Sequence, residues 1–438
     1  MTSASSHSHA DHHAQASGDG HGHGPDRAYL LREDNITLSP GTGRGLSRAL
    51  LGAGVIGIVL AGFGSTMIGP AGASHALAAL HVGVMACLAV TLGNLWYILL
   101  FSLVRSGWSA TIRRQMENVA SLVPLLGVGV IGICVADLVL GHPLFRWMGE
   151  HQGDYLLSKK SAWLNQPFFY VRIVVYLMVW TFLARRMTGL SLEQDRTGDK
   201  WLSAKAAATG AWGMLFFALS VAFASFDLLM ALDHRFFSTM WGVYYFAGSA
   251  YAGIAVCILI TASLRRLGRL EGVVTEEHNH DMGKFLFAFT VFWAYIAFSQ
   301  YFLIWYSNIP EETAYYIARK TGGWNALFSF LVFGHFLVPF ILLLFRPFKK
   351  RPGLVMAMAG WAILAHVADV FWIVRPSVYA SGDFVDKIGV GGLWVDVVAI
   401  GGVMAVFAAL VIRKVTSGVL VAVNDPYMDQ ALEHKNYV

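Results

Sequence analysis

Ionisable side chains inside otherwise apolar stretches are the residues of this sequence best suited to chemistry. A charged group at mid-bilayer costs on the order of 3 kcal/mol, so each one that is kept indicates a partner, a water-filled cavity or a function. Carboxylates and imidazoles can accept protons, because burial and neighbouring charges tune their pKa, and an arginine can balance their charge. On this basis the candidate catalytic residues are Asp137, Arg172, Asp227, His142 and His81.

A second set of polar residues could carry protons onward. His366 and Asp369 are three residues apart, so they share one helix face and could form a hydrogen-bonded pair, either structural or part of a proton path. His335 stands alone, which is more typical of a histidine packed in a core. The candidates for a proton path are His335, His366, Asp369, Asp396, Gln300 and Tyr301.

These groups gather in one half of the apolar runs, the half that the charge pattern below assigns to the periplasmic side. The other half offers mainly hydroxyls and amides, such as Asn94, Ser121 and Thr290. A cation transporter usually keeps its ionisable groups near the midplane, whereas a quinone headgroup site lies at one interfacial level. The distribution favours quinol or quinone as substrate. We also predict that Asp137 and Arg172 lie within ion-pair distance, which could serve either structure or catalysis.

Ten apolar runs must position these residues. The chain of 438 residues is 56% hydrophobic and 13% charged, which excludes an ordinary soluble domain. Each run is continuous and long enough to cross hydrocarbon as a helix, and far longer than a membrane β-strand. We therefore predict an all-α integral membrane protein of about ten transmembrane helices. The runs lie near 46–68, 76–103, 119–140, 165–184, 207–230, 239–263, 284–306, 323–346, 353–374 and 390–412.

Lysine and arginine predict the orientation of these helices. The segments on the N-terminal side of the membrane carry 23 of them and the opposite connectors carry 8. By the positive-inside rule both termini are cytoplasmic, and we predict a periplasmic loop at Pro310–Glu312. The membrane we expect is a bacterial inner membrane. The basic residues form short caps and not a stripe, so the net charge of +5 does not indicate nucleic-acid binding.

The composition divides the chain into three parts. Residues 1–40 read as a disordered, His-rich cytoplasmic tail, because this segment cannot build a core. Residues 41–415 form the polytopic membrane domain, and residues 416–438 form a cytoplasmic C-terminal tail.

We expect no cofactor and no metal ion bound in this chain. The three cysteines lie in three different apolar runs, without the spacing that holds zinc or an iron–sulfur cluster. A diheme cytochrome b needs axial histidines paired across helices at two depths, and the intramembrane histidines do not supply two such pairs.

Two long stretches resemble a known family, and two short ones support the match. They are FDLLMALDHRFFSTMWGVYYFAG at 226–248, HDMGKFLFAFTVFWAYIAFSQYFLIWYSNIPEET at 280–313, GHFLVPF at 334–340 and NDPYM at 424–428. All four resemble the membrane subunits of alternative complex III, which are related to the NrfD-like membrane subunits of polysulfide reductase. The NIPEET and NDPYM forms look more like the smaller, ActF-like subunit.

The resemblance implies a fold of two four-helix bundles with flanking helices. It also implies a subunit of a respiratory quinol:cytochrome c oxidoreductase that contributes a quinone-site-like or proton-conducting bundle. The implied partners are membrane lipid, a paralogous NrfD-like membrane subunit, and periplasmic subunits that carry iron–sulfur clusters and several c-type hemes. A terminal oxidase is a further candidate partner. A secondary ion or solute transporter and a purely structural membrane subunit remain the alternatives.

Overall fold

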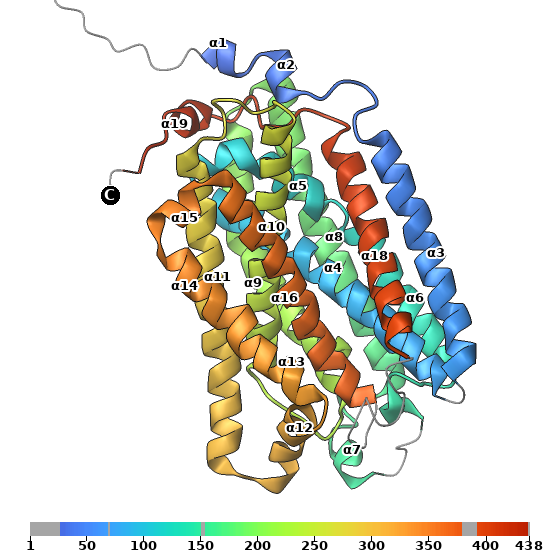
Figure 1. The fold of residues 1–438 in the computed structure, drawn as a ribbon. Coiled ribbons are helices and arrows are strands. Elements are labelled where there is room, and N and C mark those ends of the chain that lie inside the picture. The colour runs from blue at the N-terminus through green and yellow to red at the C-terminus, as the bar shows by residue number, and fades with distance from the viewer. Residues whose placement is uncertain (1–26, 69–70, 150–153, 379–391, 437–438) are drawn as a thin grey trace, which may run out of the picture.

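The computed structural model describes residues 27–68, 71–149, 154–378 and 392–436 (Figure 1). Within these ranges every regular element is a helix and no strand occurs. Ten helical segments are long and apolar enough to cross a membrane, so the chain is a multi-pass, all-helical membrane protein, as predicted. Their ends lie within a few residues of most of the predicted boundaries, because hydrophobic length is a strong signal.

The first five spans contain α3 (Arg44–Ile68), α4 (Gly72–Leu103), α5 (Ala110–Ala120) followed by α6 (Val123–Val139), α8 (Gln166–Thr197) and α9 (Trp201–Leu228). The other five contain α10 (Trp241–Arg266), α11 (Glu276–Ser307), the broken span α13 (Trp324–Phe330) to α14 (Val338–Leu344), α16 (Pro352–Val378) and α18 (Leu393–Val415). A π-helical turn, η4 (Leu331–Leu337), lies between α13 and α14. Short helices are α1 (Arg27–Leu30), α2 (Glu33–Ile36), α7 (Tyr155–Lys159), α12 (Pro310–Lys320), α15 (Arg346–Lys350) and α19 (Met428–Leu432), with 3₁₀ turns η1 (Gly107–Ser109), η2 (Arg146–Met148) and η3 (Met230–Leu232).

Local sequence fixes the ends of the long helices. The Asn165 side chain caps α8 by accepting the backbone N–H of Phe168, and the helix ends at Gly198, whose φ of 69° suits glycine. Thr275 and His278 form a reciprocal capping box at the start of α11. The connector that starts at Pro310, expected as a loop, is the helix α12, with proline in its first turn.

The spans pack as two four-helix bundles with two flanking helices. Helices α4, α6, α8 and α9 form the first bundle, and α10, α11, α16 and the segment from α13 to α14 form the second. Helices α3 and α18 run side by side along the first bundle, with α18 against α4 (Figure 1). The two bundles meet where α4 packs on α10, so α4 is almost wholly buried.

One glycine permits the closest approach between the bundles. A Cβ atom placed on Gly93 of α4 would lie 1.9 Å from the backbone oxygen of Ser249 in α10. Only a residue without a side chain fits there, because protein interiors are close-packed and tolerate little added volume.

Both ends of the described chain lie on the same side of the molecule. Arg27 of α1 forms an ion pair of 2.9 Å with Asp429 of α19. The Asn35 side chain donates to the Glu271 carbonyl oxygen, and both Asn35 and Ile36 are buried. Residues 27–36, which we expected inside a disordered tail, therefore form α1 and α2 against neighbouring loops. The histidine-rich segment before them lies outside the described residues.

Candidate functional site

The first bundle holds a buried carboxylate that is saturated with hydrogen bonds. Asp227 of α9 accepts from Arg172 Nε at 2.8 Å and from Arg172 Nη2 at 2.7 Å. It also accepts from the Tyr176 hydroxyl and the Trp163 indole N–H, each at 2.9 Å. The Arg172 guanidinium lies 4.1 Å from the centroid of the Trp163 ring. A carboxylate with four donors has little acceptor capacity left for a substrate.

The predicted pair between Asp137 and Arg172 is wrong. Asp137 accepts from His142 Nδ1 at 3.0 Å and from the backbone N–H of Leu144 at 2.7 Å. These donors reach it because Gly141 and His142 have positive φ angles, 77° and 63°, and turn the chain back over the end of α6. The prediction rested on the similar depth of the two residues in neighbouring spans. Depth alone indicates neither this turn nor the face of α8 on which Arg172 lies.

His81, the last candidate in this bundle, bridges two helices. Its Nε2 atom lies 2.8 Å from the Leu228 carbonyl oxygen of α9. The first-bundle candidates are therefore divided among three separate sets of structural contacts.

In the second bundle, polar groups from two helices converge on Asp369 of a third. This buried carboxylate of α16 accepts from the Tyr244 hydroxyl of α10 at 2.5 Å and from the Trp293 indole N–H of α11 at 3.1 Å. The Trp293 ring in turn stacks on the His335 imidazole, with 3.7 Å between ring centroids. His335 is fully buried, and neither of its ring nitrogens has a hydrogen-bond partner among the described residues.

His335 lies in the π-helical turn η4. Such turns are rare and occur frequently at functional sites, because the extra residue redirects a side chain. A buried imidazole without a hydrogen-bond partner costs free energy. The ring nitrogens of His335, unpaired among the described residues, are therefore a second feature that points to a functional position. Sequence reasoning found the histidine and not the turn that directs it.

The hydrogen bond that the spacing of His366 and Asp369 allowed does not form. Asp369 is engaged by α10 and α11, whereas the His366 ring lies against the Ala86 backbone of α4. Side chains three residues apart on a helix lie near one another. On α16, however, Asp369 faces α10 and α11, whereas His366 faces α4.

A cavity of about 450 Å³ adjoins the Asp369 cluster. Tyr244 and Trp293, the two donors to Asp369, form part of its wall. Exposed residues of α11 and η4, Tyr295, Phe298 and Val332, lie at its edge, so it opens on the surface that lipid would cover. Its lining is mostly aromatic and aliphatic: Tyr244, Val291, Trp293, Ala294, Tyr295, Ala297, Phe298, Tyr301, Tyr316, Phe328, Leu331, Val332, Phe336 and Trp372.

The remaining candidates for a proton path are Tyr301 and Gln300, which lie at or near the cavity, and Asp396, which does not. Tyr301 lines it and accepts from Lys320 Nζ at 3.3 Å, and Gln300 is buried beside Tyr316. Asp396 of the flanking helix α18 does not line the cavity. It pairs with Arg375 Nε at 3.0 Å and with His75 Nε2 at 3.0 Å, which joins α18, α16 and α4.

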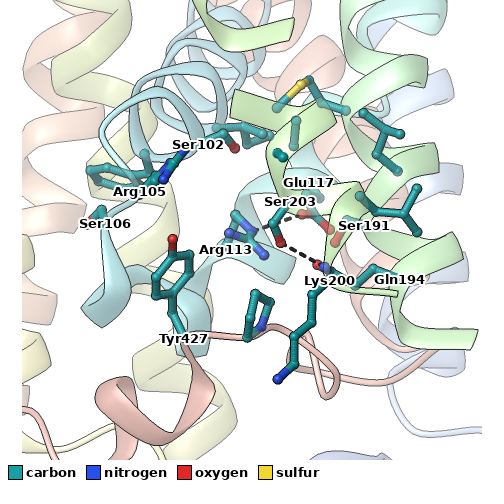
Figure 2. A pocket seen from close by; sticks show the side chains of 18 residues that line it. Ser102, Arg105, Ser106, Arg113, Glu117, Ser191, Gln194, Lys200, Ser203 and Tyr427 are labelled. Carbon is teal, nitrogen blue, oxygen red and sulfur yellow. Dashed lines mark hydrogen bonds and ion pairs between the residues drawn. The ribbon is translucent and has the colours of Figure 1, made fainter. Parts of the chain in front are cut away.

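A second pocket of about 240 Å³ lies on the side of the termini (Figure 2). Arg113 and Glu117 of α5 face it, and the Gln194 amide donates to the Ser203 hydroxyl across it. The NDPYM segment closes it, since Asp425 pairs with Arg113 and Tyr427 lies in the wall.

Buried ionisable groups thus occur on the side of the termini as well as in the half where the sequence analysis placed them. The predicted third span began too late in the chain to include Arg113 and Glu117, because α5 is amphipathic. The ion pairs of this cluster join segments far apart in the chain, Arg113 with Asp425 and Arg114 with Asp195, and hold the C-terminal tail in place.

The fold and these clusters define a class, a ten-span all-helical membrane protein with polar sites inside its bundles. No protein-family model matches the sequence, and no curated protein matches it either. Among the described residues, no group of three or more His, Cys, Asp or Glu side chains could hold a metal ion.

Proposed function

We propose that this chain is a membrane subunit of a respiratory quinol:electron-acceptor oxidoreductase of the alternative complex III type, and that quinol binds in the cavity of the second bundle. The observation that carries the proposal is the position of Tyr244 and Trp293. Both line a lipid-facing aromatic cavity, and both donate to a buried carboxylate behind it.

The cavity suits a quinol in size and chemistry. Its volume of about 450 Å³ falls inside the range of roughly 300–1,000 Å³ that is usual for small-molecule sites. Aromatic side chains pack well on a flat ring, in stacked or edge-on arrangements. The opening at Phe298 and Val332 lets an isoprenoid tail remain in lipid while the headgroup lies inside.

The polar groups give a quinol hydroxyl somewhere to send its proton. Oxidation of one quinol to a quinone releases two protons and two electrons. A substrate hydroxyl beside Tyr244 can donate one proton to the phenolic oxygen while the Tyr244 proton moves to Asp369, along the 2.5 Å hydrogen bond. The second quinol proton follows the same route after Asp369 has released the first. Positioned acid–base groups of this kind contribute about 10²–10⁴-fold to rate. The electrons go to an iron–sulfur or heme c centre in a partner subunit.

The resemblance found in the sequence supports the same site. Tyr244 lies in the stretch 226–248, Trp293 in 280–313 and His335 in 334–340. In the proposed orientation both termini are cytoplasmic, in a bacterial inner membrane, and the cavity lies in the periplasmic half, close to the expected iron–sulfur and multiheme partners. The paralogous membrane subunit would pack beside this chain.

The test uses the intact complex, with subunit content checked first. Asp369→Asn and Tyr244→Phe should each lower quinol oxidation by about 10²-fold, because the proton acceptor is removed. Tyr306→Phe is the matched control, since Tyr306 of α11 is 77% exposed and lies outside the cavity.

A photoreactive benzoquinone analogue separates this site from one in the paralogous subunit. It should label peptides of α11 and of the segment from α13 to α14, and excess quinol should suppress the labelling. Full assembly with unchanged turnover in both variants, or labelling confined to other subunits, would contradict the proposal.

A further inference from the structure

A groove of about 700 Å³ lies on the outer surface of α8, beside α6. Among the described residues, it shares no lining residue with the proposed quinol cavity and only Leu190 with the pocket on the side of the termini. Most of its length is apolar, with Ile131 of α6 facing Val174, Leu177 and Met178 of α8. Two consecutive arginines, Arg185 and Arg186, line the half of the groove nearer the termini, which continues to Glu193. The groove therefore has two chemically distinct halves, one apolar and one that carries paired positive charges.

The arginines lie at the level where hydrocarbon gives way to headgroups. The part of α8 from Gln166 to Ala184 spans about 28 Å at a rise of 1.5 Å per residue, close to the roughly 30 Å of a hydrocarbon core. It contains a single charged residue, Arg172, which is engaged inside the bundle by Asp227. Arg185 and Arg186 follow immediately, and both are exposed.

The charges of the arginines are largely uncompensated. Among the described residues, Arg185 forms no hydrogen bond or ion pair, and Arg186 donates to the Thr209 hydroxyl at 3.1 Å. Glu193 also lines the groove, two turns further along α8, so one negative charge faces two positive ones. Guanidinium groups bind phosphate with paired hydrogen bonds.

One residue that lines the groove lacks a side chain. A Cβ atom placed on Gly189 of α8 would meet open space, with no atom within 4 Å. Gly189 lies one turn from Arg185, in the charged half of the groove nearer the termini.

We propose that this groove is a binding site for one anionic glycerophospholipid of the leaflet on the side of the termini. Arg185 and Arg186 bind the phosphate, and an acyl chain lies along Met178, Val174 and Ile131. Basic pockets between transmembrane helices bind anionic headgroups in this way. The assignment is independent of the quinol site.

The test measures lipid retained by the purified protein in nanodiscs of phosphatidylglycerol mixed with phosphatidylcholine. After transfer to detergent, native mass spectrometry should show one retained phosphatidylglycerol. The double variant Arg185→Gln/Arg186→Gln should weaken its binding about 30-fold, from about 1 kcal/mol for each charge near the surface. Arg196→Gln, on the same helix and outside the groove, is the matched control and should retain the lipid.

A second variant tests the headgroup half, beyond the arginines, without changing charge. Gly189→Leu adds bulk to open space, and leucine is a better helix former than glycine, so the fold should tolerate it. It should also reduce the retained lipid. Equal retention in the wild type and both groove variants would overturn the proposal, as would equal retention of phosphatidylcholine.

Two further outcomes would also overturn it. If inorganic phosphate alone displaces the lipid, the arginines form a simple anion site and the apolar groove contributes nothing. If cross-linking from Met178→Cys captures another protein chain in place of lipid, the groove is a subunit interface.

Discussion

Arg172 and Asp227 bind each other inside the first bundle through two hydrogen bonds of 2.8 and 2.7 Å, which tie α8 to α9. Tyr176 and Trp163 donate to the same carboxylate, so every polar atom of Asp227 is engaged. Such a network resembles a structural link between helices more than a site that awaits a substrate. It also explains why a charge is kept where insertion is costly.

Removal of one member of this pair should destabilise the protein without a specific effect on catalysis. Asp227→Ala leaves the Arg172 charge buried and unpaired, which costs about 3–5 kcal/mol. The double variant Arg172→Leu/Asp227→Leu should recover much of that loss, because two apolar residues leave no unpaired charge. Thermal unfolding in detergent measures both. A single variant with wild-type stability and strongly reduced turnover would instead give Asp227 a catalytic role.

Filling the cavity of the second bundle should weaken quinol binding. Ala294 lines the cavity, and Ala294→Phe places a ring in the volume that a quinol headgroup would occupy. We expect KM for quinol to rise at least about 10-fold, with a smaller change in kcat, because ground-state binding is lost. Ala288→Phe, an exposed position on the same helix, is the control. Equal kinetics for the two variants would place quinol elsewhere.

The membrane spans were predicted well because the hydrophobicity of many consecutive residues adds up to a strong signal. Each run is long, continuous and apolar, so errors of a few residues do not change the number of helices. The packing of α4, α6, α8 and α9 as one bundle agrees with the family resemblance, which carries information that hydropathy does not.

Contacts between side chains were harder to predict. Depth along a helix can be counted from the sequence, but the direction in which a side chain points depends on how the helices rotate against one another. Asp137 and Arg172 were assigned the same depth and have different partners. His366 and Asp369 share one helix and also contact different neighbours. The π-helical turn at His335 changes the helical register, and no sequence pattern indicated it.

The close contact of α4 with α10 should make Gly93 intolerant of substitution. Gly93→Ala puts a methyl group 1.9 Å from the Ser249 oxygen, so the two bundles must separate. Overpacking of this kind typically costs about 1–3 kcal/mol, and rigid backbone on both sides favours the upper end. Gly132→Ala, which meets open space, is the control. Similar thermal midpoints for the two variants would show that the helices approach less closely.

The loop between α6 and α8 should loosen at acid pH through Asp154. The hydrogen bond from His234 Nε2, at 3.1 Å, is the main cause that lowers the pKa of Asp154 from 3.8 to about 2, and the backbone N–H of Leu156 adds to it. A carboxylate with a depressed pKa binds fewer protons in the folded state, so its stabilising contribution is complete above about pH 4 and is lost as the pH falls towards 2.

The Leu156 amide reports this change directly, because it donates to Asp154 Oδ1 at 2.8 Å. We expect its protection from hydrogen exchange, corrected for the intrinsic rate at each pH, to fall between pH 4 and pH 2. In Asp154→Asn the protection should be lower at pH 5 and should change little over that window. Asp199→Asn, whose carboxylate accepts from the Trp201 backbone N–H on the side of the termini, is the control and should leave Leu156 unaffected. If Leu156 in the wild type stays equally protected at pH 5 and pH 2, the bond to His234 does not stabilise the ionised carboxylate.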